Sequence, residues 1–101
     1  FILAPEIFVD PMSITFDTTA AGSSNLKLLT IYNIGNATLT ISNISSTESV
    51  FSTNLTSYDI QPGDSQMVQV AFTPTEPIIY TSNLFVISND SEMDTLIVPV
   101  S

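Results

Sequence analysis

Three carboxylates recur at alternate positions near the end of the sequence: Asp90, Glu92 and Asp94. Carboxylate oxygens are the ligands that Ca²⁺ prefers, and three of them on one loop could hold this hard cation. The run lacks the glycine that gives an EF-hand loop its sharp turn. We therefore favour the simpler interpretation, a solvated acidic loop that binds no metal.

Most other catalytic chemistry is excluded by residue type. The 101-residue chain contains no His, Cys, Arg or Trp, and its one basic residue is Lys27. Nucleophile–base pairs usually need His, Lys or a thiolate, transition-metal sites need His or Cys, and phosphate recognition needs Arg or Lys. A carboxylate pair could in principle hydrolyse glycosides, but no spacing and no aromatic sugar platform supports it. We expect no catalytic residue, no cofactor and no enzymatic activity.

The charge limits the partners of the chain. The formal net charge is −9, which repels nucleic acid and anionic membrane surfaces. No apolar run approaches the roughly 18 residues that a membrane-spanning helix requires. We therefore expect neither nucleic acid nor a membrane span. The length fits one domain, and because the first residue is Phe1 and not Met, we interpret the chain as a mature product or an excised segment.

Four asparagines are each followed two residues later by Ser or Thr, which is the acceptor pattern for N-glycosylation. They are Asn36, Asn43, Asn54 and Asn89. All four lie near predicted turns or loop ends, where a glycan would fit. The pattern is only mildly enriched over chance, and it favours a glycoprotein that is extracellular or exposed at the cell surface.

Apolar residues alternate with polar ones along the chain, and no helical period is sustained, which predicts strands. The expected inward sets are Ile7 and Val9; Met12, Ile14 and Phe16; Leu29 and Ile31; Leu39 and Ile41; Val68, Val70 and Phe72; Leu84 and Val86; and Leu96, Val98 and Val100. A short edge strand is expected at Val50 and Phe51. Turns are expected at residues 33–36, where Gly and Asn accept positive φ, and at residues 61–64. About seven short strands with regular turns predict an all-β, seven-stranded immunoglobulin-like β-sandwich.

An ordered set of segments also occurs in a known family. The segments are Ile7-Phe8-Val9-Asp10-Pro11, Ile14-Thr15-Phe16, Leu29-Thr30-Ile31-Tyr32-Asn33-Ile34-Gly35, Leu39-Thr40-Ile41, Ile60-Gln61-Pro62-Gly63-Asp64, Val70-Ala71-Phe72-Thr73-Pro74, Leu84-Phe85-Val86-Ile87-Ser88-Asn89-Asp90 and Val98-Pro99-Val100. In this order they resemble the ASH domains, named after abnormal spindle and hydin, and the bacterial choice-of-anchor D modules, with major sperm protein more distant. The resemblance implies a single non-enzymatic sandwich over residues 1–101, of a kind used in surface proteins, cilia and centrosomal scaffolds.

Some apolar residues fall on the outer side of the predicted strands. If Leu84 and Val86 point inward, Phe85 and Ile87 point outward, and Ile97 of the last strand joins them. An exposed cluster of this kind usually marks an interaction surface, and the alternative is that neighbouring loops cover it.

The first residues are also unusually apolar. Phe1, Ile2 and Leu3 precede Pro5, and Ile7 and Phe8 follow. Residues 1–5 could pack on their own domain, serve as a linker, or add to a sheet edge of a neighbouring copy. We assign two groups to self-association: the outward cluster, and the N-terminal residues Phe1, Ile2, Leu3, Ile7 and Phe8. Head-to-tail contacts form open filaments when the rotation between copies does not close.

The sequence therefore predicts a non-enzymatic extracellular structural protein that assembles with itself into a surface filament or array. The alternative is a protein- or glycan-binding module from a larger multidomain cell-surface protein, and the length of the encoded gene would discriminate between the two. An intracellular scaffold domain is disfavoured, because such modules often meet acidic tubulin or anionic lipid, which a charge of −9 repels.

Overall fold

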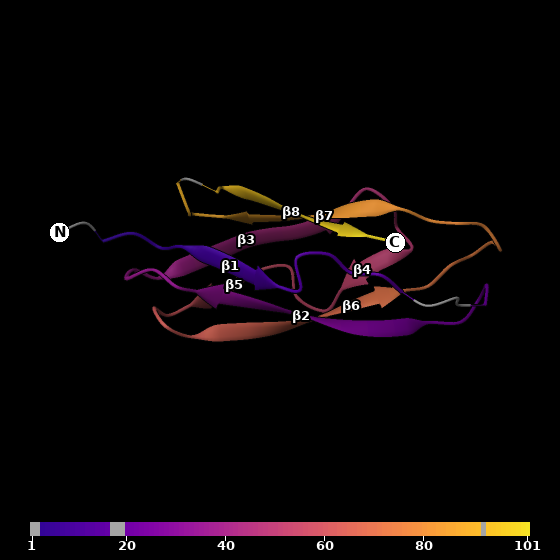
Figure 1. Cartoon of the computed structure of the whole chain (residues 1–101), viewed down its shortest axis with the longest axis horizontal. Coiled ribbons are helices and arrows are strands. Elements are labelled where there is room, and N and C mark those ends of the chain that lie inside the picture. Colours follow the sequence, from indigo (N-terminus) through magenta and orange to yellow (C-terminus); the bar gives the residue numbers. More distant parts are fainter. Residues whose placement is uncertain (1–2, 17–19, 92) are drawn as a thin grey trace.

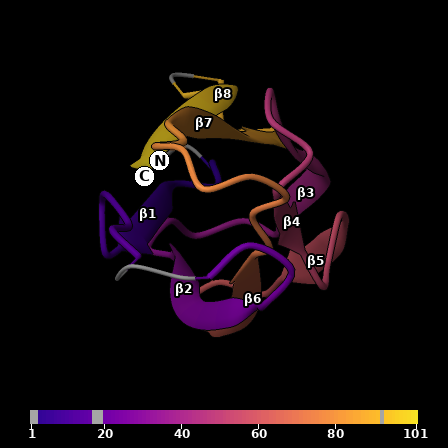
Figure 2. The same ribbon diagram turned by 90° about the vertical axis from the view of Figure 1, so that its right-hand side faces the viewer.

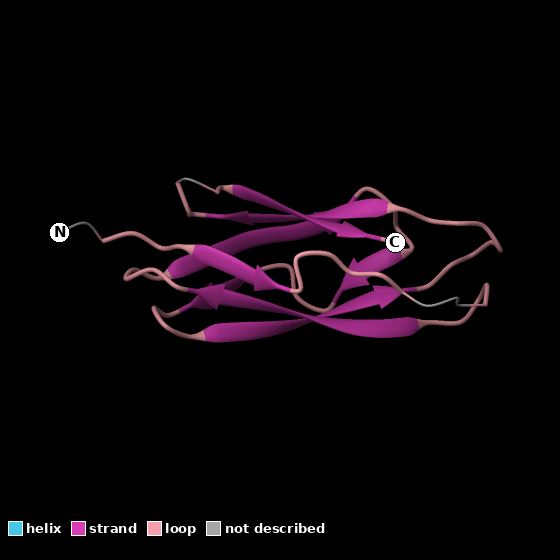
Figure 3. Ribbon diagram, in the orientation of Figure 1, coloured by secondary structure: helices cyan, strands magenta, loops and turns pink. Residues whose placement is uncertain are grey.

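The computed structural model describes residues 3–16, 20–91 and 93–101, and these residues form eight β-strands without a helix (Figure 1 and Figure 3). The strands are β1 (Ile7–Asp10), β2 (Asn25–Asn33), β3 (Leu39–Ser46), β4 (Phe51–Thr53), β5 (Tyr58–Ile60), β6 (Ser65–Phe72), β7 (Ser82–Ser88) and β8 (Thr95–Val100). Within the described part of the chain, no helix has the length and apolar character needed to cross a membrane.

The strands form two four-stranded sheets, in the orders β1-β2-β6-β4 and β5-β3-β7-β8. The strand pairs within both sheets are antiparallel. The sheets pack face to face as an elongated sandwich that measures 53 × 19 × 18 Å (Figure 1 and Figure 2). The predicted immunoglobulin-like β-sandwich is thus confirmed, with eight strands where the sequence predicted seven.

The core fills the space between the sheets with the inward residues of both. In β6, for example, Val68, Val70 and Phe72 are buried while Met67 and Gln69 are exposed. Phe16, Phe51 and Phe72 pack together with ring centroids 4.9 to 6.0 Å apart. The period-two pattern therefore corresponds to real burial, as expected for strands with one face on a core.

The chain changes sheets after the cis Asp10-Pro11 peptide bond. Proline has no N–H for a sheet ladder, so β1 ends there. Ile14 then forms a parallel bridge with Val100 of the other sheet, and its N–H donates to the Pro99 carbonyl at 2.9 Å. The prediction that Met12 faces inward with Ile14 and Phe16 is wrong: Met12 lies in the crossing and is exposed, because the alternation restarts on the new sheet.

Two further local predictions need correction. The strand β5 was not expected, since Tyr58 and Asp59 are exposed and only Ile60 is buried, which leaves no alternation to recognise. Gly35 does not have a positive φ, which among described glycines occurs at Gly22 and Gly63. The turn at residues 61–64 has the expected form, with φ of 82° at Gly63 and an Asp64 N–H that donates to the Gln61 carbonyl at 3.0 Å.

Candidate interaction surfaces

The outer side of the β5-β3-β7-β8 sheet carries the predicted apolar cluster, which we call the β7–β8 face: Phe85, Ile87 and Ile97. Phe85 lies directly opposite Ile97 in the strand register. Ile97 is 53% exposed and Ile87 is 36% exposed, while Phe85 is half-buried. The neighbouring strands oppose Phe85 and Ile87 with uncharged residues. The face is therefore a small apolar patch surrounded by hydroxyl and amide groups.

The other sheet has a second apolar outer face, of which only Phe8 was predicted from the sequence as an interaction residue. We call it the β1–β2–β6 face, and it consists of Phe8, Leu26, Leu28, Tyr32 and Met67. Phe8 opposes Tyr32 in the register and their ring centroids lie 5.9 Å apart. The other three side chains are more than half exposed. The available signal was the parity of Leu26 and Leu28, which is opposite to that of the buried Leu29 and Ile31.

The N-terminal residues that we assigned to self-association differ in their burial. Ile7 is buried in the core of its own domain, so its assignment to an interface was wrong, since alternation in β1 turns it inward and Phe8 outward. Leu3 is 66% exposed. Phe1 and Ile2 lie outside the described residues.

The segment that leads into β1 is held against the turn that follows β2. The Ala4 N–H donates to Asn36 Oδ1 at 2.8 Å, and the Asn36 N–H donates to the Ala4 carbonyl at 3.0 Å. The Ile34 N–H donates to the Glu6 carbonyl at 2.9 Å. Residues 4–6 are thus fixed by main-chain hydrogen bonds to their own domain.

The buried side chain of Asn33 organises this junction. Its Oδ1 accepts from the N–H groups of Glu6 at 3.3 Å and Gly35 at 3.0 Å. Its Nδ2 donates to the carbonyl groups of Ala37 at 2.6 Å and Ile60 at 3.0 Å. One amide therefore satisfies four main-chain groups from three segments, including the turn that we expected Asn33 to tie.

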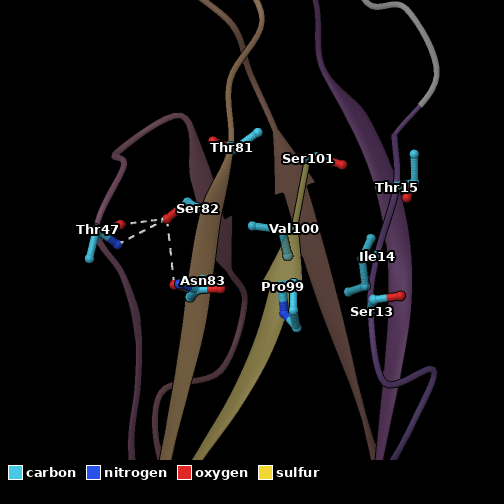
Figure 4. Close-up of a pocket in the computed structure, with 10 residues that line it drawn as sticks. All are labelled: Ser13, Ile14, Thr15, Thr47, Thr81, Ser82, Asn83, Pro99, Val100 and Ser101. Atoms are coloured by element: carbon cyan, nitrogen blue, oxygen red, sulfur yellow. Dashed lines mark hydrogen bonds between the residues drawn. The ribbon is translucent and has the colours of Figure 1, made fainter.

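Hydroxyl groups gather in a shallow pocket of about 430 Å³ beside the end of β8 (Figure 4). The pocket is lined by residues from four regions of the chain, including Ser13, Thr47, Ser82 and Ser101. Thr47 and Ser82 bond to each other, with 2.7 Å between their hydroxyl oxygens. None of the described residues that line it has an ionisable side chain of the kind that acid–base or nucleophilic catalysis uses.

The acidic residues proposed as a calcium site do not converge in the described structure. Asp90 is buried and its Oδ2 accepts from the Ile7 N–H at 3.0 Å, while Asp94 is exposed and Glu92 lies outside the described residues. Among the described residues, no group of three possible ligands is placed to hold a metal ion. The Asp90 carboxylate instead joins the loop before β8 to the start of β1.

Asp90→Ala is expected to lower the free energy of unfolding by about 2 kcal/mol, because it leaves the Ile7 N–H without this charged acceptor. Asp94→Ala removes the same group from an exposed position and should change it by less than about 0.5 kcal/mol. Thermal unfolding of the two variants, with and without millimolar Ca²⁺, measures both effects. Equal losses, or stabilisation of the parent chain by Ca²⁺ that Asp90→Ala abolishes, would contradict this assignment.

The four glycosylation candidates are all exposed, but three of them already bond to the main chain. Asn36 Oδ1 accepts from Ala4, Asn54 Oδ1 accepts from the Gln69 N–H at 2.8 Å, and Asn89 Oδ1 accepts from the Thr40 N–H at 2.9 Å. We expected Asn43 near a turn or loop end, but it lies within β3 at a register shift. Asn36, Asn54 and Asn89 thus have structural roles, and glycosylation stays a prediction for all four sites.

Comparison with known proteins agrees with this architecture. A protein-family model described as "ASH: Abnormal spindle-like microcephaly-assoc'd, ASPM-SPD-2-Hydin" matches residues 2–94. The ASH / PapD-like domain of human CEP192 is similar with a TM-score of 0.83 at 19% identity, over 96% of this chain and 83% of that chain. A protein of unknown function from Porphyromonas gingivalis W83 is similar with a TM-score of 0.78 at 18% identity, over 97% of this chain and 46% of that chain.

A third solved structure, WR4, a C. elegans MSP family member, has a TM-score of 0.73 at 11% identity, over 93% of this chain and 94% of that chain. No curated protein sequence matches the chain. At these identities the structural similarities show a shared fold. The chain spans less than half of the Porphyromonas gingivalis protein.

Proposed function

The chain belongs to the ASH family of immunoglobulin-like domains, and from that premise we propose that it is a structural module of an extracellular or cell-surface assembly, which associates with further copies of itself through its outer faces. ASH domains are typically non-catalytic, and the described residues offer no cluster for acid–base or metal chemistry. A protein of this composition acts through its surface. The observation that carries the proposal is the exposure of Ile87 and Ile97 beside the half-buried Phe85.

The charge distribution supports contact between copies at this face. Two chains that each carry a charge of −9 repel one another over most orientations. The residues that oppose Phe85, Ile87 and Ile97 are Ser45, Asn43 and Thr95 among others, and none of them is charged. Apolar burial can therefore exceed the repulsion at this face more readily than at the acidic loops.

The presence of two different apolar faces supports an array over a closed dimer. The β7–β8 face and the β1–β2–β6 face lie on opposite outer sides of the sandwich (Figure 2). Contact between unlike faces is heterologous, so each added copy exposes a fresh face for the next. This arrangement would produce the surface filament or array that the sequence suggested.

Ile97→Lys is expected to weaken self-association at least tenfold, because it places a charged ammonium group on the β7–β8 face. The variant also lowers the net negative charge, so general repulsion between copies falls and cannot explain a weaker association. Gln61→Lys makes the same charge change in the exposed β5–β6 turn, away from both faces, and should not weaken association. Sedimentation velocity over a range of concentrations measures the effect.

Two results of that experiment would overturn the proposal. One is a parent chain that sediments as a monomer at every concentration. The other is an equal response of the Ile97→Lys and Gln61→Lys variants, which would assign any association to net charge alone.

A glycan on Asn43 would compete with this contact. Asn43 opposes Ile87 in the strand register, so an attached sugar would stand over the β7–β8 face. Glycosylation at Asn43 and self-association through this face are therefore alternatives. A glycan found at Asn43 would argue against assembly through the β7–β8 face.

The second candidate function is a protein- or glycan-binding module of a larger cell-surface protein. It is supported by the Porphyromonas gingivalis structure, in which a similar fold occupies 46% of the chain. In that case the same faces would contact neighbouring domains or another surface protein. A long reading frame that encodes adjacent similar domains, together with a monomeric isolated chain, would favour this candidate.

A further inference from the structure

An apolar cleft of about 620 Å³ opens at the end of the sandwich where β6 ends and β7 begins. Its lining includes three aromatic rings of the core end, those of Phe16, Phe72 and Tyr80. The Phe16 and Phe72 ring centroids lie 5.4 Å apart, and the Phe72 and Tyr80 centroids lie 5.9 Å apart. The volume lies within the range of about 300–1,000 Å³ that is typical of ligand pockets.

The rim of the cleft is more exposed than a folded domain requires. Ile78 is 57% exposed and Ile79 is 92% exposed, and both line the cleft from the loop of residues 73–81. Ala20 and Ala21 are exposed at the cleft as well. Adjacent bare isoleucines contribute almost nothing to the core of their own domain, so they indicate a surface that another molecule covers.

Hydrogen bonds join the chain segments beside the cleft, residues 20–24 and 73–80, to one another. The Gly22 N–H donates to the Pro74 carbonyl at 2.8 Å, and the hydroxyl oxygens of Ser24 and Thr73 lie 2.8 Å apart. The Tyr80 hydroxyl lies 3.2 Å from the Thr75 hydroxyl. These bonds limit the rearrangement that the neighbouring segments need when the cleft is filled, which favours binding.

We infer that this cleft receives the apolar N-terminal segment of a second copy, residues 1–3, and so joins copies end to end. This inference rests on the self-association proposed above and assigns it a second contact. Among the described residues that line the cleft, none has a charged side chain, and Phe1, Ile2 and Leu3 carry no charged side chain either. In a chain with a net charge of −9, such a pair of uncharged partners avoids the repulsion that opposes other contacts.

The two partners lie at opposite ends of the molecule. The segment that leads into β1 lies at the end marked N in Figure 1, and the β6–β7 loop lies at the other end of the 53 Å axis. Figure 2 views the molecule from the end that holds the loop. Each copy thus has one segment to offer and one cleft to fill, which is the heterologous arrangement that propagates into a chain of copies.

A binding experiment in trans tests the inference. The acceptor is the full-length chain carrying Phe1→Ser, Ile2→Ser and Leu3→Ser, so that its own segment does not compete. The probe is a synthetic peptide of residues 1–8 with a fluorophore at its C-terminus, followed by fluorescence polarisation. We expect saturable binding that weakens at least tenfold when the acceptor also carries Ile78→Ser and Ile79→Ser.

Because Ile79 is almost fully exposed, these substitutions should leave the fold intact, and circular dichroism checks this. A peptide with Phe1→Ser and Leu3→Ser is the matched control and should not bind. Three results would overturn the inference: equal binding of both peptides, equal binding to both acceptors, or no saturable binding. The absence of saturable binding is also the result expected if the cleft takes a different apolar ligand.

The outcome is separable from that of the proposed contact through the β7–β8 face. An acceptor with Ile97→Lys should bind the peptide as the parent acceptor does. Peptide binding that depends on Ile78 and Ile79, in a chain whose sedimentation is unchanged by Ile97→Lys, supports the cleft and rejects the face. Loss of association in Ile97→Lys without peptide binding supports the face and rejects the cleft.

Discussion

Asn33→Asp is expected to lower the free energy of unfolding by about 3–5 kcal/mol, since it replaces a fully bonded buried amide by a group that cannot donate to the carbonyl groups of Ala37 and Ile60. Both carbonyl oxygens would then face a carboxylate oxygen and not an N–H. A domain of this size has a stability of about 5–15 kcal/mol, so the variant should lose a large part of it.

The loss should also depend on pH. Burial raises the pKa of the introduced carboxyl above its value in the unfolded chain, because the charged form is desolvated only in the folded state. A raised pKa in the folded state means that the folded protein loses stability as pH rises through the ordinary range of an aspartate. The destabilisation is therefore expected to be larger at pH 7 than at pH 4.

Denaturant unfolding at the two pH values measures this effect, and Asn43→Asp is the matched control. Asn43 is exposed on β3, so the same chemical change there should cost less than about 0.5 kcal/mol. Similar losses for the two variants would show that the hydrogen bonds of Asn33 do not organise the junction.

Gly35→Ala is expected to cost about 2–4 kcal/mol, because an added Cβ would lie 2.6 Å from the Glu6 nitrogen and 2.8 Å from the Pro5 carbonyl carbon. These are main-chain atoms, so the clash cannot be relieved by a change of rotamer. The segment of residues 4–6 would have to move away, which would break the bonds that join it to Ile34 and Asn36.

Gly22→Ala separates this steric effect from the conformational effect of losing a glycine. Gly22 has φ of 84° and open space around it, so an added Cβ costs only about 1 kcal/mol of backbone strain. Thermal unfolding compares the two variants, and amide hydrogen exchange should show faster exchange at Ala4 and Glu6 in Gly35→Ala alone. An equal cost for both variants, with exchange unchanged, would contradict the clash.

These two residues show where sequence reasoning succeeds and where it stops. Asn33 was expected to tie the turn after β2, and its side chain does so. The purpose of Gly35 was predicted wrongly, as a positive φ, because its constraint comes from a segment about thirty residues earlier in the chain. Local patterns report backbone conformation, whereas close approach between distant segments depends on the tertiary fold.

The same distinction explains the surfaces. Alternation placed Phe85, Ile87 and Ile97 on outer positions, because the parity of a strand is a local property. Met12 was misplaced since parity restarts where the chain passes from one sheet to the other. The end cleft could not be predicted from a pattern, because the residues around it come from segments as far apart as Phe16, Phe72 and Tyr80.

The crossing after Pro11 also determines how the domain would respond to mechanical force. Residues 14–16 run parallel to the last residues of the chain and are joined to them by three hydrogen bonds of 2.7 to 3.0 Å, from Ile14 to Pro99, from Phe16 to Ser101 and from Ser101 to Ile14. Tension applied at Ala4 and Ser101 would pull these neighbouring segments in opposite directions along their length. Such a pull loads the three bonds together in shear and does not open them one at a time, so a row of these modules under tension would resist extension at this seam.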